Sequence, residues 1–167
     1  MIHIVLLEPE IPSNTGNIGR TCLCLGAVLH LIDPLGFQLT EKNLKRAGLD
    51  YWDRLTMFRW RTYEEFMQAH PGAAIYYATT KARKLYTEVT YPEECYLLFG
   101  KESAGIPEEI LVENADRCVR LPMMPGERSL NLANAAAIMA YEVSRQQGFP
   151  GLQREGDLHR LSWPDRQ

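Results

Sequence analysis

The sequence predicts an α/β fold with a mostly parallel sheet flanked by helices. Short apolar runs alternate along the chain with helical segments, which is the order expected of βαβ units. The first run, residues 2–7, is bounded by Glu8 and Pro9, which suits a buried strand. The chain has 167 residues, of which 46% are hydrophobic and 23% are charged. This length and composition are typical of one globular domain and exclude a disordered chain or a coiled coil.

The individual elements follow from the apolar runs and from the residues that bound them. The expected strands cover residues 2–7, 28–32, 55–59, 74–78, 96–99 and 117–121. The expected helices cover about residues 13–25, 41–47, 62–69, 107–113 and 130–147. Gly26 is placed to end the first helix, and Thr62 with Glu65 forms a capping box at the third. Ser129 is a suitable N-cap for the last helix, because its hydroxyl can accept an N–H that lacks a helical partner.

Charge and targeting signals limit the partners of the chain. The formal net charge is −3, so RNA would have to meet a local basic patch rather than a basic surface. The N-terminal apolar run has no basic start, and no apolar stretch approaches the ~18 residues of a membrane span. We therefore expect a cytoplasmic protein that does not contact a membrane. The four cysteines lack paired C-x-x-C spacing, so we expect reduced thiols and no metal site.

Three loops fall where a parallel sheet places its ligands, at the carboxyl ends of strands. They are residues 8–20, 99–107 and 121–135. The second loop has backbone N–H groups that suit a carboxylate or a ribose hydroxyl, but it lacks the dinucleotide and phosphate-loop fingerprints. Taken singly, each loop also has a local explanation: an asparagine-capped helix start, a turn that needs glycine, and a capped alanine-rich core helix.

Taken together and in this order, parts of these loops resemble the motifs of the SPOUT superfamily of RNA methyltransferases. The matching segments are Asn14-Thr-Gly-Asn-Ile-Gly-Arg20, the run Leu97 to Pro107, and Leu121-Pro-Met123 followed by Ser129-Leu-Asn-Leu-Ala-Asn-Ala135. Within the superfamily, the chain is most similar to the small single-domain enzymes that methylate the wobble nucleotide of tRNA at its ribose 2′-oxygen. Residues 8–12, 46–51 and 79–81 carry this closer similarity.

The resemblance implies one domain over residues 1–151 with a deep C-terminal trefoil knot. It also implies a homodimer, with Tyr141 at its interface. S-adenosylmethionine would bind in the knot and leave as S-adenosylhomocysteine, without a metal. The matching cofactor positions are Ala78, Thr79, Gly100, Glu102, Leu121, Met123, Ser129 and Leu130. Residues 152–167 form a polar extension, for which packing against the dimer, contact with RNA and disorder all stay open.

The implied reaction is methyl transfer to the 2′-hydroxyl of cytidine or uridine 34 in the tRNA anticodon stem-loop. Arg20 matches the family's arginine. An arginine side chain is charged in essentially any protein setting and cannot readily accept a proton, so we expect it to hold a phosphate or stabilise the developing alkoxide instead of acting as a base. Asn14, Ser129 and Asn134 would orient Arg20, the cofactor or the nucleotide.

RNA contacts are expected from Arg20, Lys45, Arg46 and Lys81, although a solvated face explains any one basic residue equally well. Two alternative functions stay open. One is a 2′-O-methyltransferase of the same superfamily that acts on another tRNA position or on rRNA. The other is a non-catalytic RNA-binding protein with this fold.

Overall fold

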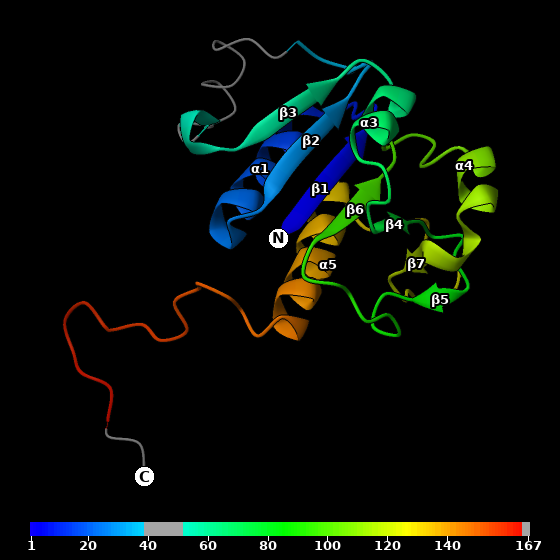
Figure 1. Ribbon diagram of the computed structural model, residues 1–167. Helices are drawn as coiled ribbons and strands as arrows, with labels where there is room; N and C mark the ends of the chain where they lie inside the picture. The colour runs from blue at the N-terminus through cyan, green and yellow to red at the C-terminus, as the bar shows by residue number, and fades with distance from the viewer. Residues whose placement is uncertain (39–51, 165–167) are drawn as a thin grey trace.

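In the computed structural model, which describes residues 1–38 and 52–164, seven strands form one sheet in the order β3-β2-β1-β6-β4-β7-β5 (Figure 1). The strands are β1 (Ile2–Leu7), β2 (Val28–Ile32), β3 (Met57–Trp60), β4 (Ile75–Ala78), β5 (Lys84–Leu85), β6 (Cys95–Phe99) and β7 (Cys118–Arg120). Every neighbouring pair is parallel. The predicted fold class is therefore confirmed.

Helices cover both faces of this sheet. Helices α1 (Pro12–Leu25) and α5 (Leu132–Gln146) pack side by side on one face (Figure 1). Helices α3 (Tyr63–Ala69) and α4 (Glu108–Glu113) contribute to the apolar core on the other face. Two 3-10 turns, η1 (Trp52–Arg54) and η2 (Ala115–Arg117), precede β3 and β7.

The central strand β1 is buried on both sides because its alternate side chains enter different apolar layers. Ile4 and Leu6 belong to the layer that contains Ile18 of α1, whereas Val5 belongs to the layer that contains Phe66 of α3. All five side chains are at most 1% exposed. Burial of each contributes about 1.5–3 kcal/mol, which explains why the strand needs an unbroken apolar run.

The elements differ from the predicted ones mainly at their ends. The strand expected at 55–59 begins at Met57, and the two-residue edge strand β5 was not predicted. The capping residue Thr62 is confirmed, because its Oγ1 accepts the Glu65 N–H at 3.1 Å. The Glu65 carboxylate accepts the N–H of Arg61, one residue before the cap, rather than that of Thr62. The helix expected at 41–47 lies outside the described residues.

Beyond α5, residues 152–164 hold no helix or strand, and every side chain from 153 to 164 is exposed. Figure 1 shows this segment leaving the end of α5 and running away from the sheet. Among the residues that the structure describes, none of the helices is long and apolar enough to cross a membrane.

Candidate active site

A pocket of about 500 Å³ opens at the carboxyl ends of β4, β6 and β7. Its walls come from residues 78–81 at the end of β4 and 99–106 at the end of β6. The remaining wall is formed along the chain from β7 into α5 by Val119, Leu121, Met123, Arg128, Ser129, Leu130, Asn131, Leu132, Ala135 and Met139. Ile11 and Asn14, from the loop that leads into α1, close the pocket on a further side. The three loops singled out in the sequence therefore converge on one cavity, although they are far apart along the chain.

The predicted cofactor positions all lie on the wall of this pocket. They are Ala78, Thr79, Gly100, Glu102, Leu121, Met123, Ser129 and Leu130. Their convergence does not by itself assign them a ligand. It does bring every one of the matching positions within reach of a single bound molecule.

Gly100 is required by the close approach of its own loop. A Cβ atom at this position would lie 2.1 Å from the carbonyl carbon of Gly105 and 2.3 Å from the nitrogen of Ile106. Such contacts leave no room for any side chain. Gly105 has a φ of 72°, the left-handed conformation that glycine adopts without strain. These two glycines let residues 101–105 fold back tightly and present backbone groups to the pocket.

The start of α1 is held by a carboxylate from the second loop. Helix α1 begins at Pro12, and its N-cap residue Ile11 makes no side-chain capping bond. Instead, the Glu102 carboxylate accepts the N–H of Glu10 at 2.8 Å, the N–H of Ile11 at 3.3 Å and the Asn14 amide at 2.9 Å. A negative charge here also complements the positive end of the helix dipole. The prediction that an asparagine caps this helix is therefore wrong, because Asn14 lies inside α1 and donates its amide N–H to Glu102.

Asn14 joins the first two loops to the third. Its Nδ2 donates to Glu102, while its Oδ1 accepts the Nδ2 of Asn131 at 2.9 Å. The Oδ1 of Asn131 in turn accepts the N–H groups of Ala133 and Asn134, at 2.9 and 3.3 Å. Asn14 is only 5% exposed, so this chain of hydrogen bonds is sheltered from water. It links the starts of α1 and α5 through two side-chain amides.

The N-cap of α5 is a correction to the sequence prediction. Asn131, and not Ser129, caps this helix, which begins at Leu132. Serine and asparagine are both good capping residues, so the local sequence does not choose between them. The long-range bond from Asn131 to Asn14 favours the later start. Ser129 is left exposed on the pocket wall.

Two more carboxylates fasten the first loop to the second. The Glu10 carboxylate accepts the Ser103 N–H and hydroxyl, both at 2.8 Å, and these hydrogen bonds lower the pKa of Glu10. Glu8 pairs with Lys101 at 2.8 Å, which raises the pKa of Lys101. Both carboxylates therefore serve to join loops.

Arg20 and Asn134 do not line the pocket. Arg20 lies on the exposed side of α1, and Asn134 lies on the exposed side of α5. Ile138 and Tyr141, which are 41% and 44% exposed, lie on the same side of α5. Within one copy of the chain, the structure thus brings Asn14 and Ser129 to the pocket, and it leaves Arg20 and Asn134 on the outer faces of the paired helices.

Of the predicted RNA contacts, Lys81 lines the pocket but is engaged by a carboxylate. Its Nζ lies 2.7 Å from Glu108 Oε1, and this contact lowers the pKa of Glu108. Arg128, which the sequence analysis overlooked, also lines the pocket, and within residues 1–38 and 52–164 it forms no ion pair. In the sequence, Arg128 could have been found as a basic residue directly before the Ser129–Ala135 segment. Lys45 and Arg46 lie outside the described residues.

The four cysteines are free, and the described ranges contain no group of three or more His, Cys, Asp or Glu that could hold a metal ion. The polar groups at this site are instead backbone amides, side-chain amides, hydroxyls and charged residues.

A parallel sheet with a loop-built pocket of this size at its carboxyl edge defines a ligand-binding protein of the α/β class. More particularly, the chain belongs to the SpoU rRNA methylase family, whose model matches residues 1–141. The superfamily resemblance seen in the motifs is thereby confirmed.

Relatives named for one reaction share nearly half of the sequence. A protein of Saccharophagus degradans named tRNA (cytidine(34)-2′-O)-methyltransferase is 47% identical over 152 residues, which cover 90% of this chain and 99% of the relative. The Escherichia coli protein of the same name is 44% identical over 152 residues and is covered to 97%.

Solved structures of RNA methyltransferases are also similar to this chain. One described as structural insights into the 2-OH methylation of C/U34 on tRNA has a TM-score of 0.83 and 44% identity, over 89% of this chain and 97% of that chain. An AdoMet-bound rRNA methyltransferase from Sinorhizobium meliloti has a TM-score of 0.75 and 28% identity, over 86% of this chain and 56% of its own.

Proposed function

We propose that the protein transfers a methyl group from S-adenosylmethionine to the ribose 2′-hydroxyl of cytidine or uridine 34 in tRNA. The observation that carries this proposal is the convergence of all eight motif positions on one pocket. It is supported by relatives of 44–47% identity that are named for this reaction and covered almost completely.

The pocket suits the cofactor on its own evidence. Its volume of about 500 Å³ falls in the range of small-molecule sites. The loop that starts at Gly100 turns so tightly that no side chain fits there, so backbone groups can approach adenine and ribose edges. Leu121, Met123 and Leu130 add apolar wall. When bound, the cofactor supplies an activated methyl group on a sulfonium, which departs as a neutral thioether.

The chain's own residues supply alignment and charge. Glu102, Asn14 and Asn131 act as positioning residues, because their hydrogen bonds fix the starts of α1 and α5 relative to the second loop. The Arg20 guanidinium is suited to hold a phosphate or to stabilise negative charge on the ribose oxygen, whose proton passes to water as the oxygen takes the methyl group. Ser129 offers a hydroxyl at the pocket wall for the cofactor or the nucleotide.

We also propose that the active unit is a homodimer formed through the outer sides of α1 and α5. Arg20 is exposed on α1, and Ile138 and Tyr141 are exposed apolar residues on α5, which packs beside it. Burial of these side chains against a second copy removes them from water. The proposed dimer also brings Arg20 of one copy toward the pocket of the other. This would explain why Arg20 does not line the pocket of a single chain.

The RNA is expected to approach the mouth of the pocket. Arg128 is the stronger candidate for phosphate contact there, because Lys81 must first leave Glu108. Lys45 and Arg46 stay proposed RNA contacts on the grounds of the sequence alone. A tRNA substrate and free cysteines both suit the cytoplasm.

A trefoil knot over the C-terminal part of the domain remains a proposal. It is supported by the sheet order, in which β7 lies between β4 and β5, and by the return of the chain from β7 to α5 on the face occupied by α1. The segment 121–131 makes this return while lining the pocket. A threaded segment would hold the third loop firmly against the second.

Two measurements test the proposed function. Wild-type protein should methylate tRNA in an assay with a tritiated methyl donor, and Arg20→Ala should lose about 100-fold or more of the rate. Calorimetry should give both proteins similar affinity for S-adenosylmethionine, and Arg61→Ala, an exposed arginine at the end of β3, should behave as wild type.

Mass spectrometry of nucleosides from cells that lack the protein should show loss of the 2′-O-methyl group at position 34 alone. Loss at another tRNA position or in rRNA would contradict the proposed target. If the wild-type protein gave no heat on titration with the cofactor, a non-catalytic RNA-binding role would replace the enzymatic one.

A further inference from the structure

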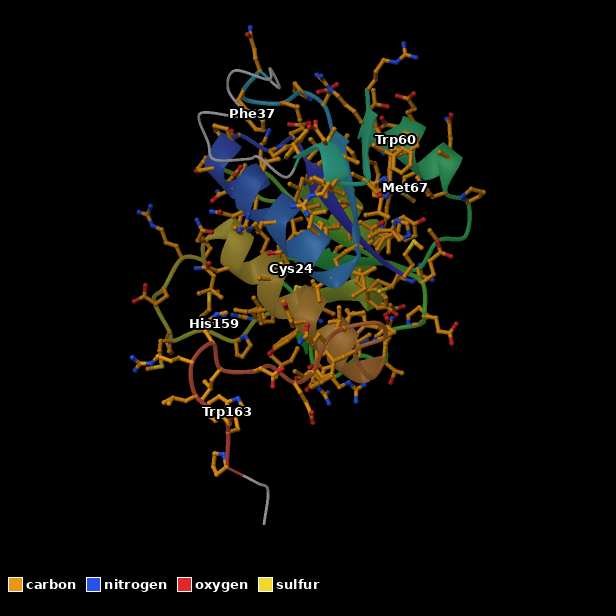
Figure 2. The ribbon with its side chains drawn as sticks, turned by 90° about the vertical axis from the view of Figure 1, so that its left-hand side faces the viewer. Cys24, Phe37, Trp60, Met67, His159 and Trp163 are labelled. Atoms are coloured by element: carbon orange, nitrogen blue, oxygen red, sulfur yellow. The ribbon has the colours of Figure 1, made fainter. Side chains whose placement is uncertain are left out.

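The C-terminal extension, residues 152–164, carries three large apolar side chains that are exposed. Leu158, Leu161 and Trp163 are 38%, 66% and 63% exposed. Figure 2 shows Trp163 and His159 on a segment that lies outside the helices and the sheet. Three exposed apolar side chains within six residues are more typical of a segment that binds a partner than of a solvated linker.

The extension folds on itself without joining the core. The indole N–H of Trp163 donates to the carbonyl oxygen of Gly156 at 2.9 Å, which closes a loop around residues 157–162. Leu158 and Leu161 lie inside this loop in sequence. One short closed loop therefore presents all three apolar side chains, which lowers the entropy cost of ordering them on a partner.

Charge argues against a nucleic acid as that partner. Arg154 and Arg160 are balanced by Glu155 and Asp157, so these residues carry no net charge. Binding to a phosphate backbone depends on an excess of Lys and Arg. The extension lacks that excess, and its exposed surface at Leu158, Leu161 and Trp163 favours an apolar protein surface instead.

The proposed dimer brings an apolar surface close to the extension. Ile138 and Tyr141, which the proposed dimer face buries, lie on the outer side of α5, and the extension begins six residues after the end of that helix. Figure 1 shows the extension leaving the end of α5 and running away from the sheet of its own chain. Its exposed apolar side chains therefore need another molecule to cover them, and the second copy that packs on α5 in the proposed dimer is the nearest one.

We propose that the extension of one copy docks through Leu158, Leu161 and Trp163 on a second copy, at the border of the face formed by α1 and α5. The proposal rests on the dimer that forms part of the proposed function. It adds a second contact region to that dimer and resolves the three roles that the sequence leaves open for residues 152–167.

The test compares the full-length protein with L158S/L161S/W163S by sedimentation equilibrium. We expect the dimer dissociation constant to rise by at least about tenfold in the triple variant. The matched control is Val112→Ser on α4, which removes an apolar side chain that is 77% exposed but remote from α5, and it should leave the constant unchanged. Because the substituted residues lie outside the core, the melting temperature measured at a concentration where both proteins are monomeric should stay close to that of wild type.

The other outcomes overturn the docking proposal. A dissociation constant that is unchanged in the triple variant contradicts it, as does a wild-type protein that is monomeric. Weaker binding of tRNA with an unchanged dimer would assign the extension to RNA. Methylation is measured in parallel above both dissociation constants, so that failure of the proposed function, no product at nucleotide 34, stays distinct from failure of the docking.

Discussion

At the scale of single residues, the orientation of the Asn14 amide decides whether two loops can meet. Its Nδ2 faces the Glu102 carboxylate at 2.9 Å, and its Oδ1 faces the Nδ2 of Asn131. The substitution Asn14→Asp keeps the shape but places one carboxylate against another. We expect the free energy of unfolding to fall by about 1–3 kcal/mol, as when a buried polar pair is broken.

Urea unfolding measures this loss, and Gln68→Glu on the exposed side of α3 is the matched change from amide to carboxylate, expected to change stability by less than about 0.5 kcal/mol. The double variant N14D/E102Q restores a donor opposite the new carboxylate and should recover part of the stability. No recovery would show that the loss does not arise from the facing carboxylates.

A second residue-scale prediction concerns Gly100. In Gly100→Ala, the methyl group would overlap Gly105, so the loop has to open, and both stability and cofactor affinity should fall. Gly156→Ala is the control, since a Cβ there meets nothing within 4 Å. Thermal unfolding and calorimetric titration with S-adenosylmethionine check both variants. Wild-type affinity in Gly100→Ala would remove this turn from the cofactor site.

At the scale of elements, β1 and β2 carry a pair of buried histidines that makes stability depend on pH. Trp60 Nε1–H donates to His30 Nδ1 at 3.1 Å, so the neutral His30 ring keeps its proton on Nε2 and donates it to His3 Nδ1 at 2.9 Å. Burial, with the nearby rings of His3 and His70, lowers the pKa of His30 to about 3, and burial also lowers that of His3 despite the Glu94 carboxylate.

Below a pH of about 6.5 the unfolded chain binds protons at these histidines more readily than the folded chain does, so stability should fall as the pH drops below that value. For His30 the loss between pH 7.5 and 5.5 is about 1 kcal/mol. Urea unfolding at the two pH values measures it. His30→Gln, which cannot titrate, should lose less than wild type, and His159→Gln in the exposed extension should match wild type. An equal pH dependence in wild type and His30→Gln would rule out His30 as its source.

The same scale shows what a single sequence can predict. Each central strand has an apolar run because both of its faces are covered, so β1 and β2 were predicted with their observed bounds. The edge strand β5 has two residues and leaves Lys84 exposed, so no apolar run reveals it. The cap of α5 was assigned to Ser129 because local propensity favours serine as much as asparagine. The bond that decides for Asn131 reaches 117 residues back to Asn14.

At the scale of the whole molecule, Arg20, which was predicted to act at the pocket, does not line the pocket of its own chain. The family resemblance implied which positions meet at the pocket, and they can meet there because the carboxyl ends of parallel strands share one edge of the sheet. It did not predict that Arg20 would lie outside the pocket of its own chain. Arg20 is on the exposed side of α1, where we propose that a second copy contacts it.

A mixed dimer tests this arrangement. Leu130→Arg fills the pocket wall of one copy, and Arg20→Ala removes the guanidinium of the other. Each variant alone should be inactive. If Arg20 acts across the interface, a mixed dimer holds one complete site, made of the open pocket of the Arg20→Ala copy and the arginine of the Leu130→Arg copy. Random exchange of subunits should then restore about a quarter of the wild-type rate of tRNA methylation, since half of the dimers carry one working site of two.

If Arg20 serves its own pocket, neither site of the mixed dimer is complete and the mixture stays inactive. Mixing each variant with itself under the same exchange conditions controls for the effect of the procedure.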